Sequence, residues 1–264
     1  MKDMFRALWA YRYFVLSSIR NDFRLKFIQS KLGTLWMVIH PLMQVLIFAL
    51  ILSEVLSARL PGIDNKYAYA LYLMAGMLFW MLFSETVNKC MLLFVENANL
   101  IKKVAFPRIC LPFIAAGSVL VNYVLLMVAI FVVFAVLGHF PGIQACWLPV
   151  LTVVTLGFAM AIGLLLGVLN VFMRDISQIV PVILQALFWL TPIVYRIDIL
   201  PEHVARVFKH NPLYPLAASY QNVLLFDHPP VWSGVLPLVL VTFVLGFVSL
   251  LVFRRASPEM VDAL

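Results

Sequence analysis

The stretch Leu111–Leu137, LPFIAAGSVLVNYVLLMVAIFVVFAVL, contains no charged residue. It is longer than a bilayer-spanning helix, which needs about 20 apolar residues. The whole chain has the same character, since 64% of its 264 residues are hydrophobic and 12% are charged. Soluble domains have about 45–50% apolar and about 25% charged residues. The sequence therefore predicts an all-α polytopic membrane protein, and it excludes a water-soluble enzyme and a disordered chain.

Five further apolar runs bring the expected number of membrane helices to six. They lie at about Leu35–Leu56, Tyr67–Cys90, Cys146–Phe172, Ile179–Tyr195 and Val235–Phe253. Most Lys and Arg residues fall before the first run, between the second and third, or after the last. Because basic loops stay in the cytoplasm, we expect both termini there. The net charge of +7 has the same explanation, so no nucleic-acid partner is expected.

The N-terminal residues 5–29 predict a basic amphipathic helix. Apolar residues recur at steps of three, four or seven, at Phe5, Leu8, Trp9, Leu16, Ile19, Phe23 and Phe27. Such a helix lies in the membrane interface, and the alternative is a helix packed on the bundle. No signal peptide is expected. We divide the chain into an interface helix within 1–31, a six-span domain at 32–255 and a cytoplasmic tail at 256–264.

A long outer connection at residues 196–234 separates the last two runs. It contains Pro201, Pro212, Pro215, Pro229 and Pro230, and its apolar piece Leu213–Phe226 is too short to span a bilayer. Irregular backbone at membrane depth survives where protein buries it or where it lines a wet cavity. We expect short re-entrant or interfacial helices here, at the outer mouth of a pathway.

Charged residues within the predicted spans are few. Glu85 and Lys89 have i, i+4 spacing, which predicts a structural ion pair on one helix face, although a charge inside a membrane is also a functional candidate. The sequence has no phosphate-binding loop, no metal-ligand spacing and no nucleophile turn. We therefore expect no catalytic residue, metal or cofactor in this chain, and a pump built on it needs energy from a partner.

Several motifs together resemble the permease subunit of type-2 ABC exporters for cell-surface polysaccharide. They are FRLKFIQSKLGTLW at 23–36, NANLIKKVAFPR at 97–108, NVFMRDI at 170–176, FWLTPIVY at 188–195 and NPL at 211–213. The resemblance extends from about residue 10 to 255. It is strongest to permeases for lipopolysaccharide O-antigen, with capsule and teichoic-acid permeases as near relatives.

The resemblance implies a homodimer in the bacterial inner membrane, with two copies of a separate ATPase subunit that binds ATP and Mg. The loop 96–110 matches the segment that couples to this ATPase, and the turn at 174–175 matches a second contact. The implied coupling residues are Asn97, Asn99, Lys102, Lys103, Phe106, Pro107, Arg108, Arg174 and Asp175. The alternative for the basic residues is an anchor to anionic lipid headgroups.

The implied substrate is a lipid-linked polysaccharide, whose hydroxyl groups cannot cross hydrocarbon without loss of hydrogen bonds. Aromatic rings can stack on sugar faces, and the candidates for the channel are Tyr69, Tyr72, Phe79, Trp80, Phe188, Trp189 and Tyr195. Basic residues suit the lipid diphosphate, and the candidates on the N-terminal gate helix are Arg20, Arg24, Lys26 and Lys31. Aromatic enrichment at membrane interfaces explains the same rings without a channel.

Three other functions remain open on the sequence alone. The first is a capsule, teichoic-acid or drug exporter of the same superfamily. The second is a membrane-embedded enzyme of lipid or glycan metabolism, which predicts a cluster of Asp, His or Arg on one membrane face. The third is a passive channel, which predicts activity without an ATPase.

Overall fold

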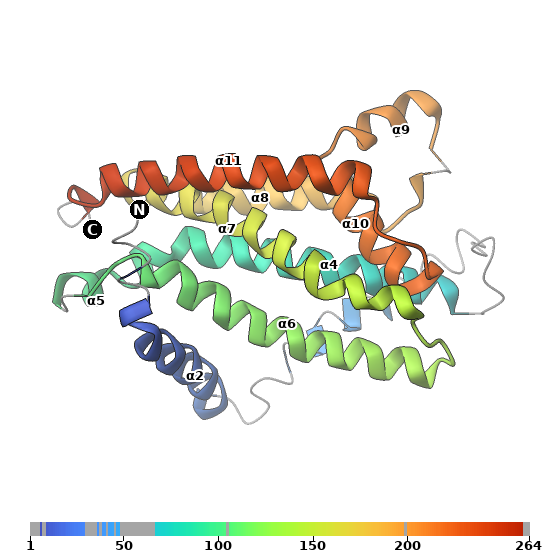
Figure 1. Cartoon of the computed structure of the whole chain (residues 1–264), viewed down its shortest axis with the longest axis horizontal. Helices are drawn as coiled ribbons and strands as arrows, with labels where there is room; N and C mark the ends of the chain where they lie inside the picture. Colours follow the sequence, from blue (N-terminus) through green and yellow to red (C-terminus); the bar gives the residue numbers. More distant parts are fainter. Residues whose placement is uncertain are drawn as a thin grey trace.

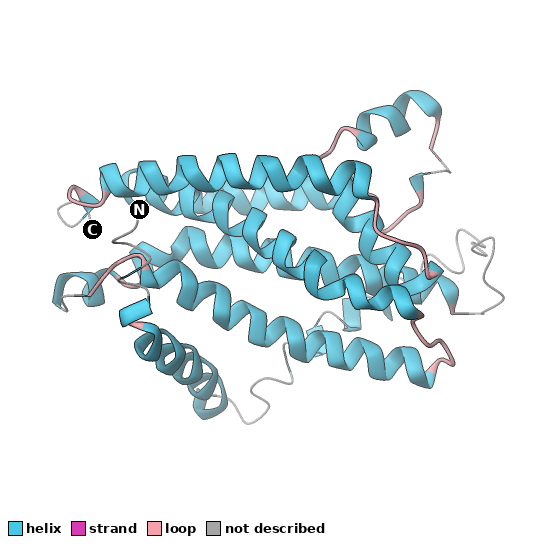
Figure 2. Ribbon diagram, in the orientation of Figure 1, coloured by secondary structure: helices cyan, strands magenta, loops and turns pink. Residues whose placement is uncertain are grey.

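The computed structural model of the chain describes residues 9–29, 67–103, 106–197 and 200–260, with isolated positions at residues 6, 36, 39–40, 42–44 and 46–47. For residues 26–29 it describes the backbone alone. The described ranges are helical and contain no strand (Figure 2). The first predicted span, Leu35–Leu56, lies outside the described residues except at the isolated positions.

The helices follow the predicted apolar runs closely. In chain order they are α2 (Arg12–Gln29), α4 (Ala68–Glu96), α5 (Ala98–Lys103), α6 (Cys110–Val136), the 3-10 turn η1 (Ile143–Trp147), α7 (Leu148–Phe172), α8 (Ile176–Leu190), α9 (Glu202–Lys209), α10 (Tyr214–Gln221), the π-helical turn η3 (Asn222–Phe226) and α11 (Trp232–Ala256). Among the described residues, α4, α6, η1 with α7, and α11 are long and apolar enough to cross a membrane. These four confirm the second, third, fourth and sixth predicted runs as helices.

The fifth predicted run, Ile179–Tyr195, is helical only in its first part, and the structure does not confirm it as a span. Helix α8 has 15 residues and ends at Leu190, so it extends about 22 Å, less than the hydrocarbon core of about 30 Å. The helix stops because Pro192 follows: the residue before a proline is driven out of the helical region, and Thr191 is extended with ψ of 128°. Residues 192–195 leave the helix and form a turn.

Helix α4 is the centre of the bundle, with α6, α7 and α10 packed on it and α11 packed on α7 (Figure 1). Glycines let α7 approach closely. A Cβ atom at Gly163 would lie 2.6 Å from the Cβ of Cys90, and one at Gly167 would lie 2.5 Å from the carbonyl oxygen of Cys90. Small residues at such crossings allow the tight packing that holds membrane helices together.

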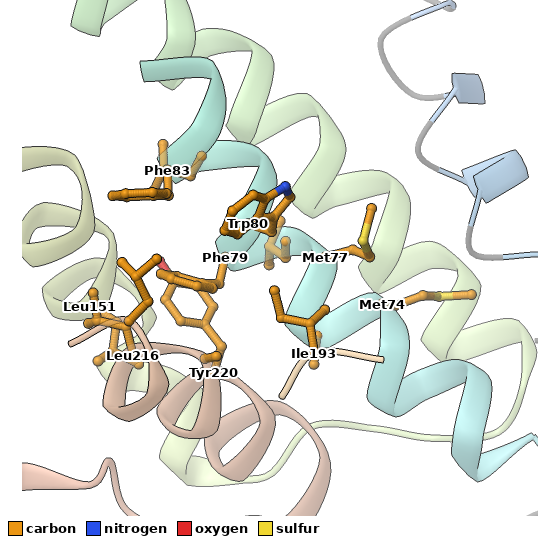
Figure 3. Packing of buried hydrophobic residues seen from close by; sticks show 14 of the residues in the cluster. Met74, Met77, Phe79, Trp80, Phe83, Leu151, Ile193, Leu216 and Tyr220 are labelled. Atoms are coloured by element: carbon orange, nitrogen blue, oxygen red, sulfur yellow. The ribbon is translucent and has the colours of Figure 1, made fainter. Parts of the chain in front are cut away.

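The larger part of the core surrounds α4, with buried residues from α6, α7, α8, α10 and α11. Tyr220 of α10 is fully buried, and its ring lies 5.7 Å from that of Phe79. Figure 3 shows these two rings among Trp80, Leu151 and Leu216. The short helix α10 is therefore packed inside the bundle, as expected for apolar residues in a segment too short to span a membrane.

A second cluster, here called the junction cluster, lies where α4, α5, α6, α7 and α11 meet. It consists of Cys90, Leu93, Phe94, Ile101, Ile109, Leu111, Ala115, Leu164, Val168, Val171, Phe253 and Met260. Helix α5 lies at this end of the bundle, and α9 and α10 lie at the opposite end (Figure 1).

Helix α2 packs against α6 rather than lying free of the bundle. A Cβ atom at Gly117 of α6 would collide with the side chain of Ile19. The face that packs includes Phe14, Ser18 and Ile19, whereas Leu16 is 61% exposed. Residues four apart in a helix, such as 14, 18 and 22, share one face, and this face packs on α6. Leu16 was predicted on the same apolar face as Ile19, but it lies on the open side.

Candidate functional site

The segment 97–108 between α4 and α6 forms a compact projection. Asn97 ends α4: its backbone N–H and its Nδ2 both donate to the carbonyl oxygen of Leu93, at 3.2 and 2.8 Å. Helix α5 follows at once. At the other side, the carbonyl oxygen of Pro107 accepts a hydrogen bond of 2.9 Å from the N–H of Cys110, where α6 begins. Residues 104–105 lie outside the described residues.

The projection has a polar side and an apolar side. Asn99, Lys102 and Lys103 are exposed, whereas Ile101 is buried in the junction cluster. The ring of Phe106 lies 5.5 Å from that of Phe14 on α2. The lysines at the last turn of α5 are therefore open to solvent, while the apolar side fixes α5 to the bundle.

Arg108 differs from the two lysines, because it turns into the protein. It is half-buried, and its Nη1 donates to the backbone carbonyl oxygen of Ser257 and, at 3.0 Å, to the hydroxyl oxygen of the same residue. Ser257 directly follows the last residue of α11. The coupling role predicted for Arg108 stays a prediction, and in this chain its guanidinium is bound internally.

The second predicted contact, Arg174 and Asp175, lies in an exposed turn between α7 and α8. Asn170, at the end of α7, holds this turn. Its Oδ1 accepts a hydrogen bond of 3.1 Å from the N–H of Ser177, and its Nδ2 donates to the carbonyl oxygen of Met91 on α4 at 3.4 Å. The turn is near the junction cluster, since Val171 belongs to it. Both predicted coupling turns are therefore at one end of the bundle.

Glu85 and Lys89 do not pair with each other as predicted, because each side chain has a partner on another helix. Lys89 Nζ lies 2.7 Å from Asp22 Oδ2 of α2, and Glu85 accepts a hydrogen bond of 2.6 Å from Asn122 Nδ2 of α6. The two side chains share a helix face, as predicted, but each one reaches a different neighbouring helix. The i, i+4 rule describes an isolated helix surface, and tertiary partners replace it here.

Two cavities lie along the face of α4 that carries Glu85 and Lys89. One of about 220 Å³ is lined by Glu85, Asn122, His40 and the neighbouring Tyr123. The other, of about 290 Å³, lies between α2, α4, α5 and α6, and Asp22, Lys89 and Asn97 line it. Within the described ranges, His, Cys, Asp and Glu form no group of three or more that could hold a metal ion.

Of the four residues predicted for the lipid diphosphate, Arg20 and Arg24 are exposed on α2. The backbone of Lys26 belongs to α2, its side chain is not described, and Lys31 lies outside the described residues. Arg12 on the same helix lies over the rings of Trp9 and Tyr13, at 5.2 and 4.5 Å. The open side of α2 thus combines aromatic rings with guanidinium groups.

Most of the aromatic residues predicted to line a channel are buried within this chain. Tyr69, Tyr72, Phe79, Trp80 and Phe188 are 0–7% exposed. Trp80 packs on Phe188 with ring centroids 5.4 Å apart, whereas Trp189 is 48% exposed. The lining role stays a prediction, and of these seven rings Trp189 offers the most surface for it.

Tyr69 and Tyr72 bind the irregular backbone that follows α8. The hydroxyl of Tyr69 donates to the carbonyl oxygen of Val194, and that of Tyr72 donates to the carbonyl oxygen of Tyr195 at 3.2 Å. Gln221 of α10 donates to the carbonyl oxygen of Pro192 at 3.3 Å. Side chains therefore satisfy backbone groups that leave the helix, as a buried non-helical segment requires.

Three residues important to this arrangement were not among those predicted from the sequence: Asp22, Asn122 and Ser257. Asn122 is the residue with a detectable signal, because it is a lone amide within the apolar run Leu111–Leu137. A buried polar group needs a partner, so this amide predicts a contact on a neighbouring helix. Asp22 and Ser257 carry no comparable signal in the sequence.

Comparisons with known proteins agree with the motifs. Residues 14–225 match the ABC-2 type transporter family. The chain is 26% identical to an O-antigen export system permease protein RfbA of Klebsiella pneumoniae, over 96% of each chain. It is also 26% identical to the protein of the same name from Myxococcus xanthus, over 100% of each chain. A further Klebsiella pneumoniae protein of that name is 27% identical over 81% of this chain and 82% of its own length.

Proposed function

Because the chain belongs to the ABC-2 type transporter family, we propose that it is the transmembrane subunit of an ATP-driven exporter for lipid-linked polysaccharide of the O-antigen type. The observation that carries the proposal is the similarity, over nearly the full length, to relatives named O-antigen export permeases. The chain is a multi-pass membrane protein by family and by its apolar helices. Its proposed location is the bacterial inner membrane.

The proposed assembly is a homodimer of six-span subunits with both termini in the cytoplasm. Two copies of a separate ATPase subunit bind ATP and Mg below it, so this chain performs no hydrolysis itself. Support comes from the distribution of basic residues. Arg254 and Arg255 lie in the last turn of α11, at the same end of the bundle as Lys102 and Lys103 of α5, as cytoplasmic basic groups should.

The proposed contact with the ATPase is the exposed side of segment 97–108 together with the turn at 174–175. Support comes from geometry: both are exposed, and both are fastened to the bundle by buried neighbours, Ile101 for the first and Asn170 for the second. A projection that is exposed on one side and packed on the other can pass movement inward. The Pro107 turn limits its flexibility, since proline fixes its own φ angle.

The proposed substrate path uses Trp189 for stacking on sugar rings, and it places Arg20 and Arg24 of α2, with Lys26 and Lys31, at the lipid diphosphate. A guanidinium can make two hydrogen bonds to a phosphate group. Arg12 and Tyr13 are exposed on α2, and the exposed Trp9 precedes the helix. These residues suit a helix that lies in the membrane interface while its other side packs on α6.

The test is a charge reversal in cells that depend on this chain for surface polysaccharide. The double variant Lys102→Glu/Lys103→Glu should accumulate in the membrane, since both side chains are exposed. It should no longer co-purify with the ATPase, and surface polysaccharide should disappear. Lys209→Glu, an exposed lysine on α9 at the opposite end, is the matched control. Normal polysaccharide in the double variant would contradict the proposed coupling surface.

A further inference from the structure

Arg108 occupies an unusual position within segment 97–108. Lys102 and Lys103 are exposed, whereas the guanidinium of Arg108 is half-buried and bound to Ser257 through two hydrogen bonds. The two residues are 149 positions apart in the chain. This contact therefore joins the segment between α4 and α6 to the end of the last membrane helix.

The chemistry of the contact is that of a helix cap supplied from elsewhere in the fold. The last carbonyl groups of a helix have no partner inside it, and a positive charge near them is favourable. Helix α11 ends at Ala256, and the carbonyl oxygen of Ser257 accepts the hydrogen bond from Arg108 Nη1. The same Nη1 also donates to the Ser257 hydroxyl oxygen.

Apolar contacts reinforce the polar one. Phe253, in the last turn of α11, stacks on Phe94 of α4 with ring centroids 5.6 Å apart and an interplanar angle of 15°. Met260, beyond the end of α11, is fully buried in the junction cluster, to which Ile101 and Ile109 also belong. Ile101 and Ile109 of the segment between α4 and α6 thus belong to the same buried cluster as Phe253 and Met260 from the C-terminal part of the chain.

We propose, on the basis of the proposed function, that Arg108 together with Phe253, Ser257 and Met260 forms an anchor that fastens segment 97–108 to α11. Arg108 is then a positioning residue and does not contact the ATPase. Movement imposed on the exposed lysines passes through this anchor to α11, as well as through α4 and α6, which are continuous with the segment.

The test compares Arg108→Ala with Arg255→Ala in the complete exporter, with its ATPase. Arg255 is exposed in the last turn of α11, so its replacement removes one charge nearby and leaves the anchor intact. In Arg108→Ala, the ATPase should co-purify in normal amount and hydrolyse ATP. Export per ATP hydrolysed should fall about tenfold, as expected for loss of a charge-assisted hydrogen bond. Arg108→Lys should restore part of the coupling, whereas Arg255→Ala should behave as wild type.

A second pair of variants tests the apolar part without touching the segment. A chain that ends after Ser257 loses Met260 from the junction cluster, and a chain that ends after Met260 keeps it. The first should be uncoupled in the same way as Arg108→Ala, and the second should export normally. If Arg108→Ala fails to accumulate in the membrane, Arg108→Lys and these two chains carry the same test.

Two results would overturn the anchor. Loss of ATPase co-purification in Arg108→Ala would make Arg108 a direct contact, and normal export per ATP in both Arg108→Ala and the chain that ends after Ser257 would leave the anchor without a role. Failure of the proposed function looks different. In that case, the wild-type chain itself would neither bind an ATPase nor export polysaccharide.

Discussion

The hydroxyl groups of Tyr69 and Tyr72 donate hydrogen bonds to the backbone of the same chain. Both donate to carbonyl oxygens in residues 194–195, more than 120 positions away. From the sequence, these tyrosines belong to the same aromatic group as Trp189, since all lie near the ends of apolar runs. The partners that distinguish them come from a turn after α8, and no local pattern predicts which carbonyl groups that turn leaves unpaired.

The aromatic residues should separate into two classes on substitution. Trp80→Ala removes a buried ring that packs on Phe83 and Phe188, so it should lower the free energy of unfolding by about 3 kcal/mol. Trp189→Ala should leave stability nearly unchanged and slow export by up to about tenfold, because one stacking contact contributes about 0.5–1.5 kcal/mol. Thermal unfolding in detergent and surface polysaccharide at matched protein level are the two measurements.

The control for these variants is Trp147→Ala, because Trp147 is 36% exposed and packs on Trp232 rather than near α8. It should not slow export. A Trp189→Ala variant with normal export, alongside a defective Trp147→Ala, would show that other residues line the path.

Hydrophobic length predicted four of the long helices correctly. It overestimated where the helix in the fifth run ends. The run Ile179–Tyr195 is mostly apolar, but the helix ends at Leu190 because Pro192 follows. The proline was visible in the sequence. Packing between helices was not: the sequence shows Gly163 and Gly167 four residues apart, and only the structure shows that α4 is the helix they meet.

The crossing of α4 and α7 should depend on Gly167. A Cβ atom there would lie 2.5 Å from the carbonyl oxygen of Cys90, so Gly167→Ala must push the helices apart and should cost about 1–3 kcal/mol. A Cβ atom at Gly246 on α11 would meet no atom within 4 Å. Gly246→Ala should therefore be neutral or stabilising by up to about 1 kcal/mol. Equal unfolding temperatures for the two variants would contradict this packing.

At the scale of the whole molecule, composition and motifs predicted the class and the family, and residues 14–225 match the ABC-2 type transporter family. The candidate site was predicted less completely. The motif NANLIKKVAFPR identified segment 97–108. It did not show that Lys102 is exposed whereas Arg108 is half-buried and bound to Ser257, a residue from the far end of the chain. The motif gave no indication of this partner.

The proposed orientation in the membrane predicts which single cysteines an impermeant thiol reagent labels in intact cells. Cysteines at Phe140, between α6 and η1, and at His203 on α9, both exposed, should be labelled from outside. Cysteines at Asn99 and Asp175, exposed at the α5 end, should be labelled only after the membrane is opened. Cys146→Ser is the required background, because Cys90 and Cys110 are buried. Labelling of Asn99→Cys in intact cells would show that the orientation in the membrane is the reverse of the proposed one.

The proposed function is tested most directly by ATP-dependent transport in vesicles that contain the chain and its ATPase partner. Lipid-linked polysaccharide is supplied on the side to which the ATPase binds, and polymer that reaches the other side is quantified. We predict transfer that requires both ATP and an ATPase able to hydrolyse it, and that stops when the permease carries Lys102→Glu/Lys103→Glu. Transfer without ATP, or no transfer by the intact complex with its lipid-linked polymer, would contradict the proposed export function.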